Sequence, residues 1–320
     1  MIVALAGGVG GARLAVGLTA VLPPSELTIV VNTADDFEHH GLSISPDLDT
    51  VMYTLAGIAN PVLGWGRADE TWNFMSVLGA LGGESWFRLG DRDLAVHVLR
   101  TELLRKGVPL SEITRRLMSR LAIEHPVIPM SDSPVRTRVR TSEGGELAFQ
   151  DYFVRLQCKP RVTGFRFAGS RKAHVPPELR RILQGPVEAV VICPSNPYVS
   201  VAPILSVGAI RTWLRKRTFP VLAVSPIVGG NAIKGPAAKM MRELGADSTA
   251  LGVARHYGDL VDGWVIDKAD EKLQRPIERE GRSVLVTDTI MKTRARSVAL
   301  AKRVVEFARS QAGHSPSTAS

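Results

Sequence analysis

Short apolar runs rich in valine and isoleucine alternate with longer amphipathic segments along most of this chain. The apolar runs predict strands at residues 1–6, 27–31, 187–193, 220–224, 263–266 and 283–286, and the first amphipathic segment predicts a helix at 11–22. Short, fully apolar strands separated by helices are typical of a parallel sheet that is covered on both faces. The pattern therefore predicts an α/β fold: a Rossmann-like, mostly parallel sheet with helices on both faces.

The middle of the chain departs from this alternation. Helices are predicted at 93–106 and 111–121, whereas period-two alternation predicts strands at 135–141 and 147–154. We therefore expect an α+β lobe at 68–170, inserted into an α/β core of residues 1–67 and 171–308. The polar residues 309–320 predict a flexible tail.

The composition agrees with a globular protein that has a sizeable core, since 45% of the 320 residues are hydrophobic and 22% are charged. No apolar run approaches the ~20 residues that span a bilayer. The first apolar run passes straight into glycines, unlike a signal peptide. Cys158 and Cys193 lie far apart and lack the spacing of a disulfide framework or a metal site. We therefore expect a soluble cytoplasmic protein without a membrane partner.

The formal net charge of +9 indicates that the protein attracts anionic partners. The positive residues are spread along the chain, and the densest run, at 211–217, is predicted to be the exposed side of a helix. No nucleic-acid-binding motif and no interleaved aromatic residues accompany it. The charge therefore favours attraction of small anionic substrates over binding of nucleic acid.

In an open parallel sheet, ligands bind beyond the carboxyl ends of the strands, so the residues after each strand carry the candidate chemistry. The first strand is followed by Gly7, Gly8, Gly10 and Gly11, which allow backbone N–H groups and a helix N-terminus to approach a phosphate. No Gly-Lys-Ser/Thr follows, and Arg13 stands where GxGxxG has its third glycine. The loop predicts a nucleotide site in the α/β core; a tight turn without a ligand is the alternative.

Acidic residues follow the second strand. Asp36 ends one pair, and Asp47 and Asp49 form a second pair shortly downstream. Carboxylates together with substrate phosphates are the ligands that Mg²⁺ prefers, so these three are candidate metal ligands. Helix capping is the alternative for any single aspartate. The neighbouring His39 and His40 are expected to line the same site, and no histidine spacing indicates zinc.

Three further loops offer polar groups. In Leu89-Gly90-Asp91-Arg92-Asp93 the planar fork of Arg92 is suited to a ligand oxygen, although pairing with the flanking acids is the alternative. The strand predicted at 187–193 is followed by Ser195, Asn196 and Pro197, and the strand predicted at 220–224 is followed by the loop that contains Gly235 and Pro236. These residues offer small donors and exposed backbone to a ligand, and ordinary turns are the alternative for each.

Together these motifs resemble one family, in the family's order, from about residue 1 to about residue 290. The motifs are GGVGGARL, VNTADD, SPDLDTVMYTLAG, LGDRDLA, PMSDSPV, CPSNPYVSVAPIL and SPIVGGNAIKGPAAKMM. The chain resembles the 2-phospho-L-lactate transferase family of deazaflavin coenzyme (F420) biosynthesis, which includes phosphoenolpyruvate transferases. The resemblance implies a Mg²⁺-dependent transferase. It would move a phospho-carboxylate from a guanosine diphosphate-activated donor to 7,8-didemethyl-8-hydroxy-5-deazariboflavin, and release GMP.

The resemblance also implies roles for individual residues. Asp49 and Arg92 would contact the deazaflavin and carry catalysis, and Asp36, Asp47 and Asp49 would hold Mg²⁺. The guanosine diphosphate would lie against the following residues: Gly7, Gly8, Gly10, Gly11, Ser195, Asn196, Pro197, Gly235 and Pro236. The chain departs from some relatives in two places, where His39-His40 replaces a Trp and Gly10-Gly11-Ala12 replaces Gly-Thr-Pro.

The sequence leaves two other functions as alternatives. A family of nucleotide-sugar-binding regulators, similar to gluconeogenesis factor, shares the glycine loop; the SPDLDT and GDRD motifs favour the transferase. A nicotinamide-dependent oxidoreductase needs an acidic residue ~20 residues beyond the glycines, and Asp35 and Asp36 lie too far along. The family suggests a homodimer. No residue distinguishes phospholactate, phosphoenolpyruvate and phosphoglycerate as the transferred group.

Overall fold

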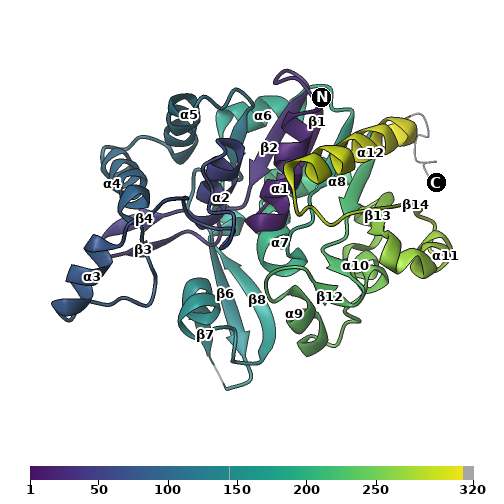
Figure 1. Cartoon of the computed structure of the whole chain (residues 1–320). Coiled ribbons are helices and arrows are strands. Elements are labelled where there is room, and N and C mark those ends of the chain that lie inside the picture. Colours follow the sequence, from purple (N-terminus) through teal and green to yellow (C-terminus); the bar gives the residue numbers. More distant parts are fainter. Residues whose placement is uncertain (144, 313–320) are drawn as a thin grey trace.

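A parallel sheet of seven strands forms the centre of the molecule, for which the computed structural model describes residues 1–143 and 145–312. In spatial order the strands are β14 (Ser283–Thr287), β13 (Gly263–Asp267), β10 (Val221–Val224), β9 (Ala189–Ile192), β1 (Ile2–Ala6), β2 (Leu27–Val31) and β5 (Val127–Pro129). Each neighbouring pair is parallel. The predicted α/β class and the six strands predicted from fully apolar runs are confirmed, and Figure 1 shows the sheet between its helices.

The chain reverses the direction in which it builds the sheet between β1 and β9. From β1 it proceeds outward to β2 and β5, then returns to β9 on the other side of β1 and continues to β10, β13 and β14. The carboxyl ends of β1 and β9 therefore flank a topological switch point, where open α/β sheets bind ligands.

Helices cover both faces because alternate strand residues point to opposite sides. Val3 and Leu5 of β1 join one core, and Ile2 and Ala4 join the other. The helices of the second core are α1 (Gly8–Thr19), α2 (Pro46–Leu55), α5 (Leu110–Arg120) and α12 (Arg294–Ala312). Those of the first are α6 (Pro177–Gln184), α7 (Ala202–Ser206), α8 (Gly208–Arg215), α9 (Ala237–Glu243), α10 (Ala250–Tyr257) and α11 (Gln274–Glu278). The helix predicted at 11–22 thus begins and ends three residues earlier, at Gly8 and Thr19.

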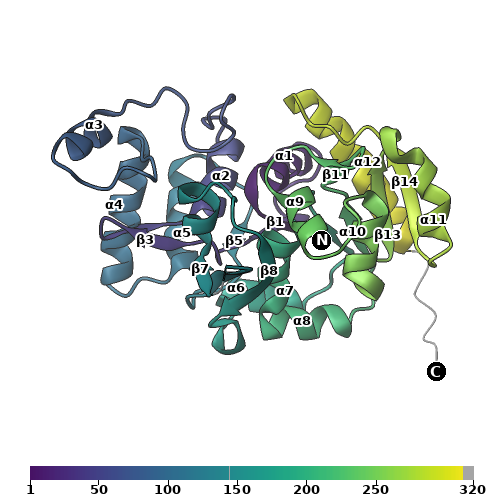
Figure 2. The ribbon, with the colours of Figure 1, turned by 90° about the horizontal axis from the view of Figure 1, so that it is seen from below.

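The middle of the chain builds the end of the molecule that carries α3 (Asn73–Ala80) and α4 (Asp91–Arg105), opposite α11 and β14 (Figures 1 and 2). Three small antiparallel sheets accompany the central one: β3 (Phe37–His39) with β4 (Leu42–Ile44), β6 (Arg136–Thr141) with β7 (Glu146–Ala148) and β8 (Val162–Ala168), and β11 (Ile227–Val228) with β12 (Asn231–Ala232). Short helical turns complete the elements: η1 (Asp151–Arg155), η2 (Ser170–Lys172), η3 (Pro197–Val201), η4 (Gly258–Leu260) and η5 (Lys268–Leu273).

Three details differ from the sequence expectations. Residues 147–154 form a strand only at their start, in β7, because the chain then turns into the helical η1. From within the range 68–170, α5 packs on the sheet and β5 completes its edge beside β2. The boundary at 309 falls inside α12, whose Arg309 pairs with Glu26 and Glu188, each at 3.0 Å. The rest of the predicted tail, 313–320, lies outside the described residues.

Helices α1 and α12 pack closely against each other across the second core (Figure 1). The contact depends on Gly17, because a Cβ atom there would lie 2.1 Å from the carbonyl oxygen of Ser297. Among the described residues, no helix is both long and apolar enough to cross a membrane.

Candidate active site

A cavity of about 540 Å³ opens at the switch point, beside the carboxyl ends of β1 and β9. This volume and position are typical of small-molecule sites. Nine of the residues predicted for the site line it: Gly7, Gly8, Gly10, Asp47, Asp49, Ser195, Asn196, Gly235 and Pro236. The structure therefore brings together segments that lie far apart in the sequence. Gly11, Asp36, Arg92 and Pro197 are not among the lining residues.

The glycine loop packs tightly against two other segments. A Cβ atom on Gly10 would lie 2.1 Å from the carbonyl oxygen of Pro194, and one on Gly7 would lie 2.6 Å from Oδ2 of Asp47. The N–H of Gly7 donates to Oγ of Ser195 at 3.1 Å, and the N–H of Gly8 donates to Oδ1 of Asp47 at 2.8 Å. Gly7 and Gly10 are thus required by contacts within the protein. The other N–H groups in the first turn of α1 have no acceptor within the helix.

Two buried carboxylates in the cavity wall have no cationic partner in the described part of the chain. Asp47, on the first turn of α2, accepts hydrogen bonds from Gly8 and from Nδ2 of Asn32 at 2.9 Å, and burial raises its pKa to about 6. Asp35 accepts from Oγ1 of Thr137 at 3.1 Å, and burial together with the charge of Asp47 raises its pKa well above the ordinary value. The pair is a site of uncompensated negative charge.

Asp36 is also buried, but it is not among the residues that line the cavity. Oγ of Ser45 donates to its Oδ2 at 2.8 Å, and its Oδ1 is buried without a hydrogen-bond partner. Burial raises the pKa of Asp36 to about 7. The structure therefore does not group Asp36 with Asp47 and Asp49 around one point in the cavity.

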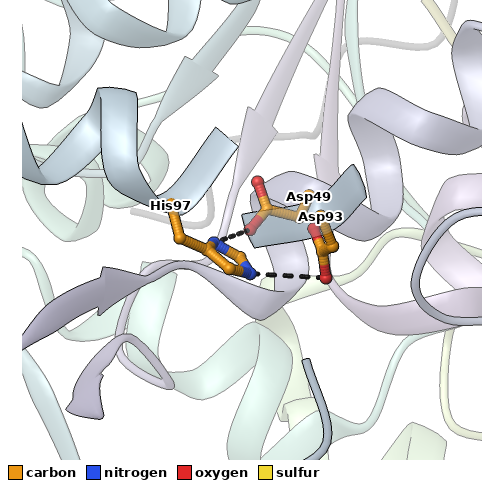
Figure 3. Close-up of side chains that lie close together, drawn as sticks. All are labelled: Asp49, Asp93 and His97. Atoms are coloured by element: carbon orange, nitrogen blue, oxygen red, sulfur yellow. Dashed lines mark ion pairs between the residues drawn. The ribbon is translucent and has the colours of Figure 1, made fainter. Parts of the chain in front are cut away.

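Asp49 belongs to a network of charges between α2 and α4. Both of its carboxylate oxygens accept hydrogen bonds from the guanidinium of Arg100, which is 2% exposed. His97 lies between two acids, with Nδ1 3.7 Å from Asp49 and Nε2 3.3 Å from Asp93, as Figure 3 shows. Tyr53 donates to Asp93. Burial raises the pKa of Asp93, but the combined effects of His97, Tyr53 and Arg100 outweigh burial and hold the pKa below its ordinary value. Arg100 therefore compensates Asp49, whereas Nε2 of His97 is buried without a hydrogen-bond partner.

The Gly90–Asp93 segment shows why Arg92 lies outside the cavity. Asp91 accepts from the N–H groups of Asn73 and Phe74 and thereby caps α3, while Glu70 accepts from the N–H groups of Arg92 and Asp93 and caps α4. The side chain of Arg92 is exposed, and within the described residues it makes no hydrogen bond or ion pair.

Arg88, four residues earlier, lines the cavity and stacks over Trp72, with Cζ 4.0 Å from the ring centroid. The loop preceding α4 therefore places Arg88, and not Arg92, among the residues that line the cavity.

Aromatic side chains form the apolar part of the wall. Trp86 and Phe87 lie on one segment, and Phe149 and Phe153 stack with ring centroids 5.3 Å apart on another. His39 and His40 are not among the residues that line the cavity, and the His39 ring packs 5.1 Å from that of Trp86. His40 stands in the turn between β3 and β4, where its Nε2 is 2.9 Å from the carbonyl oxygen of Glu84.

Five residues of the cavity and its charge network were not predicted from the sequence: Tyr53, Arg88, Asp93, His97 and Arg100. A signal was present for three of them, because Asp93, His97 and Arg100 are spaced four and three residues apart and therefore share one helix face. The pairing of Arg100 with Asp49 carries no such signal, since the two residues lie 51 positions apart.

The fold and cavity define a doubly wound α/β protein with an acidic and aromatic ligand site at its switch point. The family model for 2-phospho-L-lactate transferase CofD matches residues 2–305, and the chain belongs to that family.

The similar proteins carry two names, phosphoenolpyruvate transferase and 2-phospho-L-lactate transferase. The chain is 40% identical to a phosphoenolpyruvate transferase of Streptomyces griseus, over 96% of this chain and 98% of that protein. It is 38% identical to a 2-phospho-L-lactate transferase of Methanosarcina mazei, over 94% and 98% respectively. A solved structure of a UPF0052 family protein from Bacillus halodurans matches this chain with a TM-score of 0.59 at 12% identity. The match covers 95% of this chain and 98% of that one, and it shows that the two proteins share a fold.

Proposed function

We propose that this protein transfers a phospho-carboxylate from a guanosine diphosphate-activated donor to the 5′-hydroxyl of 7,8-didemethyl-8-hydroxy-5-deazariboflavin, in coenzyme F420 biosynthesis. The hydroxyl oxygen forms a bond to the phosphorus of the phospho-carboxylate, the bond from that phosphorus to the bridging oxygen breaks, GMP leaves with the electron pair, and the hydroxyl proton is released. The observation that carries the proposal is the family match over nearly the whole chain, joined to a large cavity with both acidic and aromatic walls.

The aromatic wall suits the acceptor. A deazaflavin is a flat, largely apolar ring system with a polar side chain, and Trp86, Phe87, Phe149 and Phe153 offer ring faces and edges of matching character. Arg88 supplies a planar cation at the same wall for the ring or side-chain oxygens of the acceptor. We therefore assign the acceptor to this part of the cavity.

The acids of the cavity fit a hard cation. Asp35 and Asp47 are buried and line the cavity, and burial raises the pKa values of both. Carboxylate oxygens are the ligands that Mg²⁺ prefers. We propose that these two acids hold Mg²⁺, in place of the Asp36, Asp47 and Asp49 set that the sequence suggested. When bound, Mg²⁺ supplies positive charge that offsets the charge developing on the phosphate oxygens.

Asp49 has a different task in this proposal. Arg100 pairs with both of its oxygens and fixes its orientation, and Asp49 lines the cavity with further lone pairs that can accept a hydrogen bond. Asp49 therefore accepts a hydrogen bond from the attacking hydroxyl and aligns it with the phosphorus. Much of the rate of phosphoryl-type transfer comes from such positioning.

The test is incubation of the protein with the deazaflavin, Mg²⁺ and each guanylated donor in turn: phospholactate, phosphoenolpyruvate and phosphoglycerate. Mass spectrometry of the product is expected to show the acceptor with one added phospho-carboxylate, and comparison of the donors identifies the group. A deazaflavin that stays unmodified with all three donors would exclude the proposed reaction. Omitting Mg²⁺ in parallel checks the metal requirement, which we expect to be strict.

We also propose a cytoplasmic homodimer. The substrates are small and water-soluble, and Cys158 and Cys193 are both free. Phe74, Val77 and Leu81 expose an apolar stripe along α3 and its end, a surface that a second subunit could cover. Light scattering coupled to size-exclusion chromatography should give twice the chain mass; a monomer at micromolar concentration would contradict the dimer without affecting the reaction.

A further inference from the structure

Two cationic side chains line the cavity beside the glycine loop. Arg13 lies on α1, and Lys234 lies between β12 and α9. The two are close enough that the charge of Arg13 contributes to lowering the pKa of Lys234, after the larger effect of burial. The cavity therefore holds two like charges near one another.

These charges lack acidic partners. Within residues 1–143 and 145–312, Arg13 makes no hydrogen bond and no ion pair, and the one hydrogen bond of Lys234 runs from Nζ to the carbonyl oxygen of Leu63 at 2.9 Å. Two neighbouring cations without a counter-charge repel each other, and an anion placed between them would remove that cost. The arrangement is thus suited to an anionic ligand.

The position of Arg13 in the glycine loop points to the same kind of ligand. In the dinucleotide fingerprint this position is a glycine, which lets the helix pack closely on the strand. Here α1 instead carries a half-buried guanidinium to the cavity. A guanidinium at the first turns of a helix adds a fixed, planar donor to the N–H groups that already favour phosphate there.

We propose that Arg13 and Lys234 bind the two phosphates of the guanosine diphosphate moiety of the donor. Arg13 acts as a planar fork on the phosphate oxygens, and Lys234 exchanges its contact with the Leu63 carbonyl for a phosphate oxygen. The inference rests on the proposed function, since it takes a nucleoside diphosphate as the ligand. It also gives the residues a role in the reaction, because the negative charge that GMP acquires on leaving develops beside them.

The experiment is isothermal titration of GDP, and separately of guanosine, into the full-length protein in the presence of Mg²⁺. The variants are Arg13→Gln and Lys234→Gln, and the matched controls are Arg120→Gln and Lys302→Gln, which change exposed side chains away from the cavity. Arg13→Gln should weaken GDP binding about ten-fold or more, and Lys234→Gln about three-fold to ten-fold, because Lys234 is more exposed and must give up an existing contact. Guanosine affinity should change less than about two-fold in every variant.

The selective loss of GDP over guanosine separates phosphate binding from a structural role. Equal losses for both ligands, or GDP binding at wild-type strength in both cavity variants, would overturn the inference and leave the proposed function intact. A wild-type protein that binds neither GDP nor a guanylated donor would overturn both. Arg13→Lys provides a variant that keeps the charge: it should bind GDP more tightly than Arg13→Gln, and a failure to do so counts against the role of charge.

Discussion

At the scale of single residues, the site is organised by how each buried charge is compensated. Asp49 has both oxygens paired with Arg100, whereas Asp35 and Asp47 have only neutral donors. Three acids that look alike in the sequence therefore have different chemistry: one is held as a fixed acceptor, and two are open to a cation.

The role of Asp49 can be tested by replacement with asparagine. Asp49→Asn keeps the shape but removes the charge-assisted acceptor for the attacking hydroxyl, so we expect kcat to fall about a hundred-fold with a smaller change in KM. Steady-state kinetics at saturating donor and acceptor provide the measurement. Turnover within about three-fold of wild type would show that Asp49 does not align the hydroxyl.

The Asp49–Arg100 pair also makes a stability prediction. Arg100→Gln leaves a buried carboxylate without its partner, which costs about 3–5 kcal/mol of unfolding free energy. Arg116→Gln, in an exposed pair with Glu112, is the control and should cost less than about 1 kcal/mol. Urea denaturation of both variants gives the comparison, and similar losses in the two would argue against burial as the cause.

His39 predicts a pH dependence. Burial lowers the pKa of His39, and its buried Nε2 has no hydrogen-bond partner. Below the unfolded pKa of about 6.5 the unfolded chain takes up a proton that the folded chain resists, so the free energy of unfolding falls as the pH drops from about 7 towards 5. His39→Phe should reduce this slope by up to about 1.4 kcal/mol per pH unit. Denaturant titrations at several pH values measure the slope, and an unchanged slope in His39→Phe would refute the assignment.

At the scale of elements, the sequence was informative wherever the hydrophobic pattern alone determines the structure. Five strands of the sheet are fully buried and the edge strand β14 is half-buried, and the apolar runs of all six identified them. The three-residue β5 (Val127–Pro129) was missed because so short a run carries no period. The turn into η1 was missed because the first residues of the strand predicted at 147–154, Leu147 and Ala148, do belong to a strand, β7.

The packing of α1 on α12 gives a prediction at this scale. Gly17→Ala would normally favour a helix by about 1 kcal/mol, but its Cβ would meet the Ser297 carbonyl oxygen, so we expect a net loss of about 1–3 kcal/mol. Gly79→Ala on α3 is the matched control: its Cβ meets nothing within 4 Å, and it should be neutral or slightly stabilising. Thermal unfolding distinguishes the two, and a stabilised Gly17→Ala would contradict the packing described here.

At the scale of the whole molecule, the order of the strands explains how distant segments come to share one cavity. The loops after β1 and β9 are 188 residues apart at Gly7 and Ser195, yet they hydrogen-bond because the chain reverses its direction of sheet building between these strands. Rules for parallel sheets predicted that strand-end residues would meet, and most of them do.

The rules for parallel sheets do not predict which groups a long side chain will contact. Arg92 and Arg88 are equally plausible in the sequence, and only the capping of α4 by Glu70 and of α3 by Asp91 determines which of the two arginines faces the cavity. Arg100 was missed for a similar reason, since its partner lies on another helix.

The central claim is that one cavity brings a guanylated donor and a deazaflavin acceptor into direct reaction. The most direct measurement is release of GMP from the donor, followed by chromatography with and without the deazaflavin in the presence of Mg²⁺. We predict that GMP forms only when the acceptor is present and in equal moles with the phospho-carboxylated deazaflavin. GMP released at the same rate without the acceptor, or no GMP with any donor, would contradict the account.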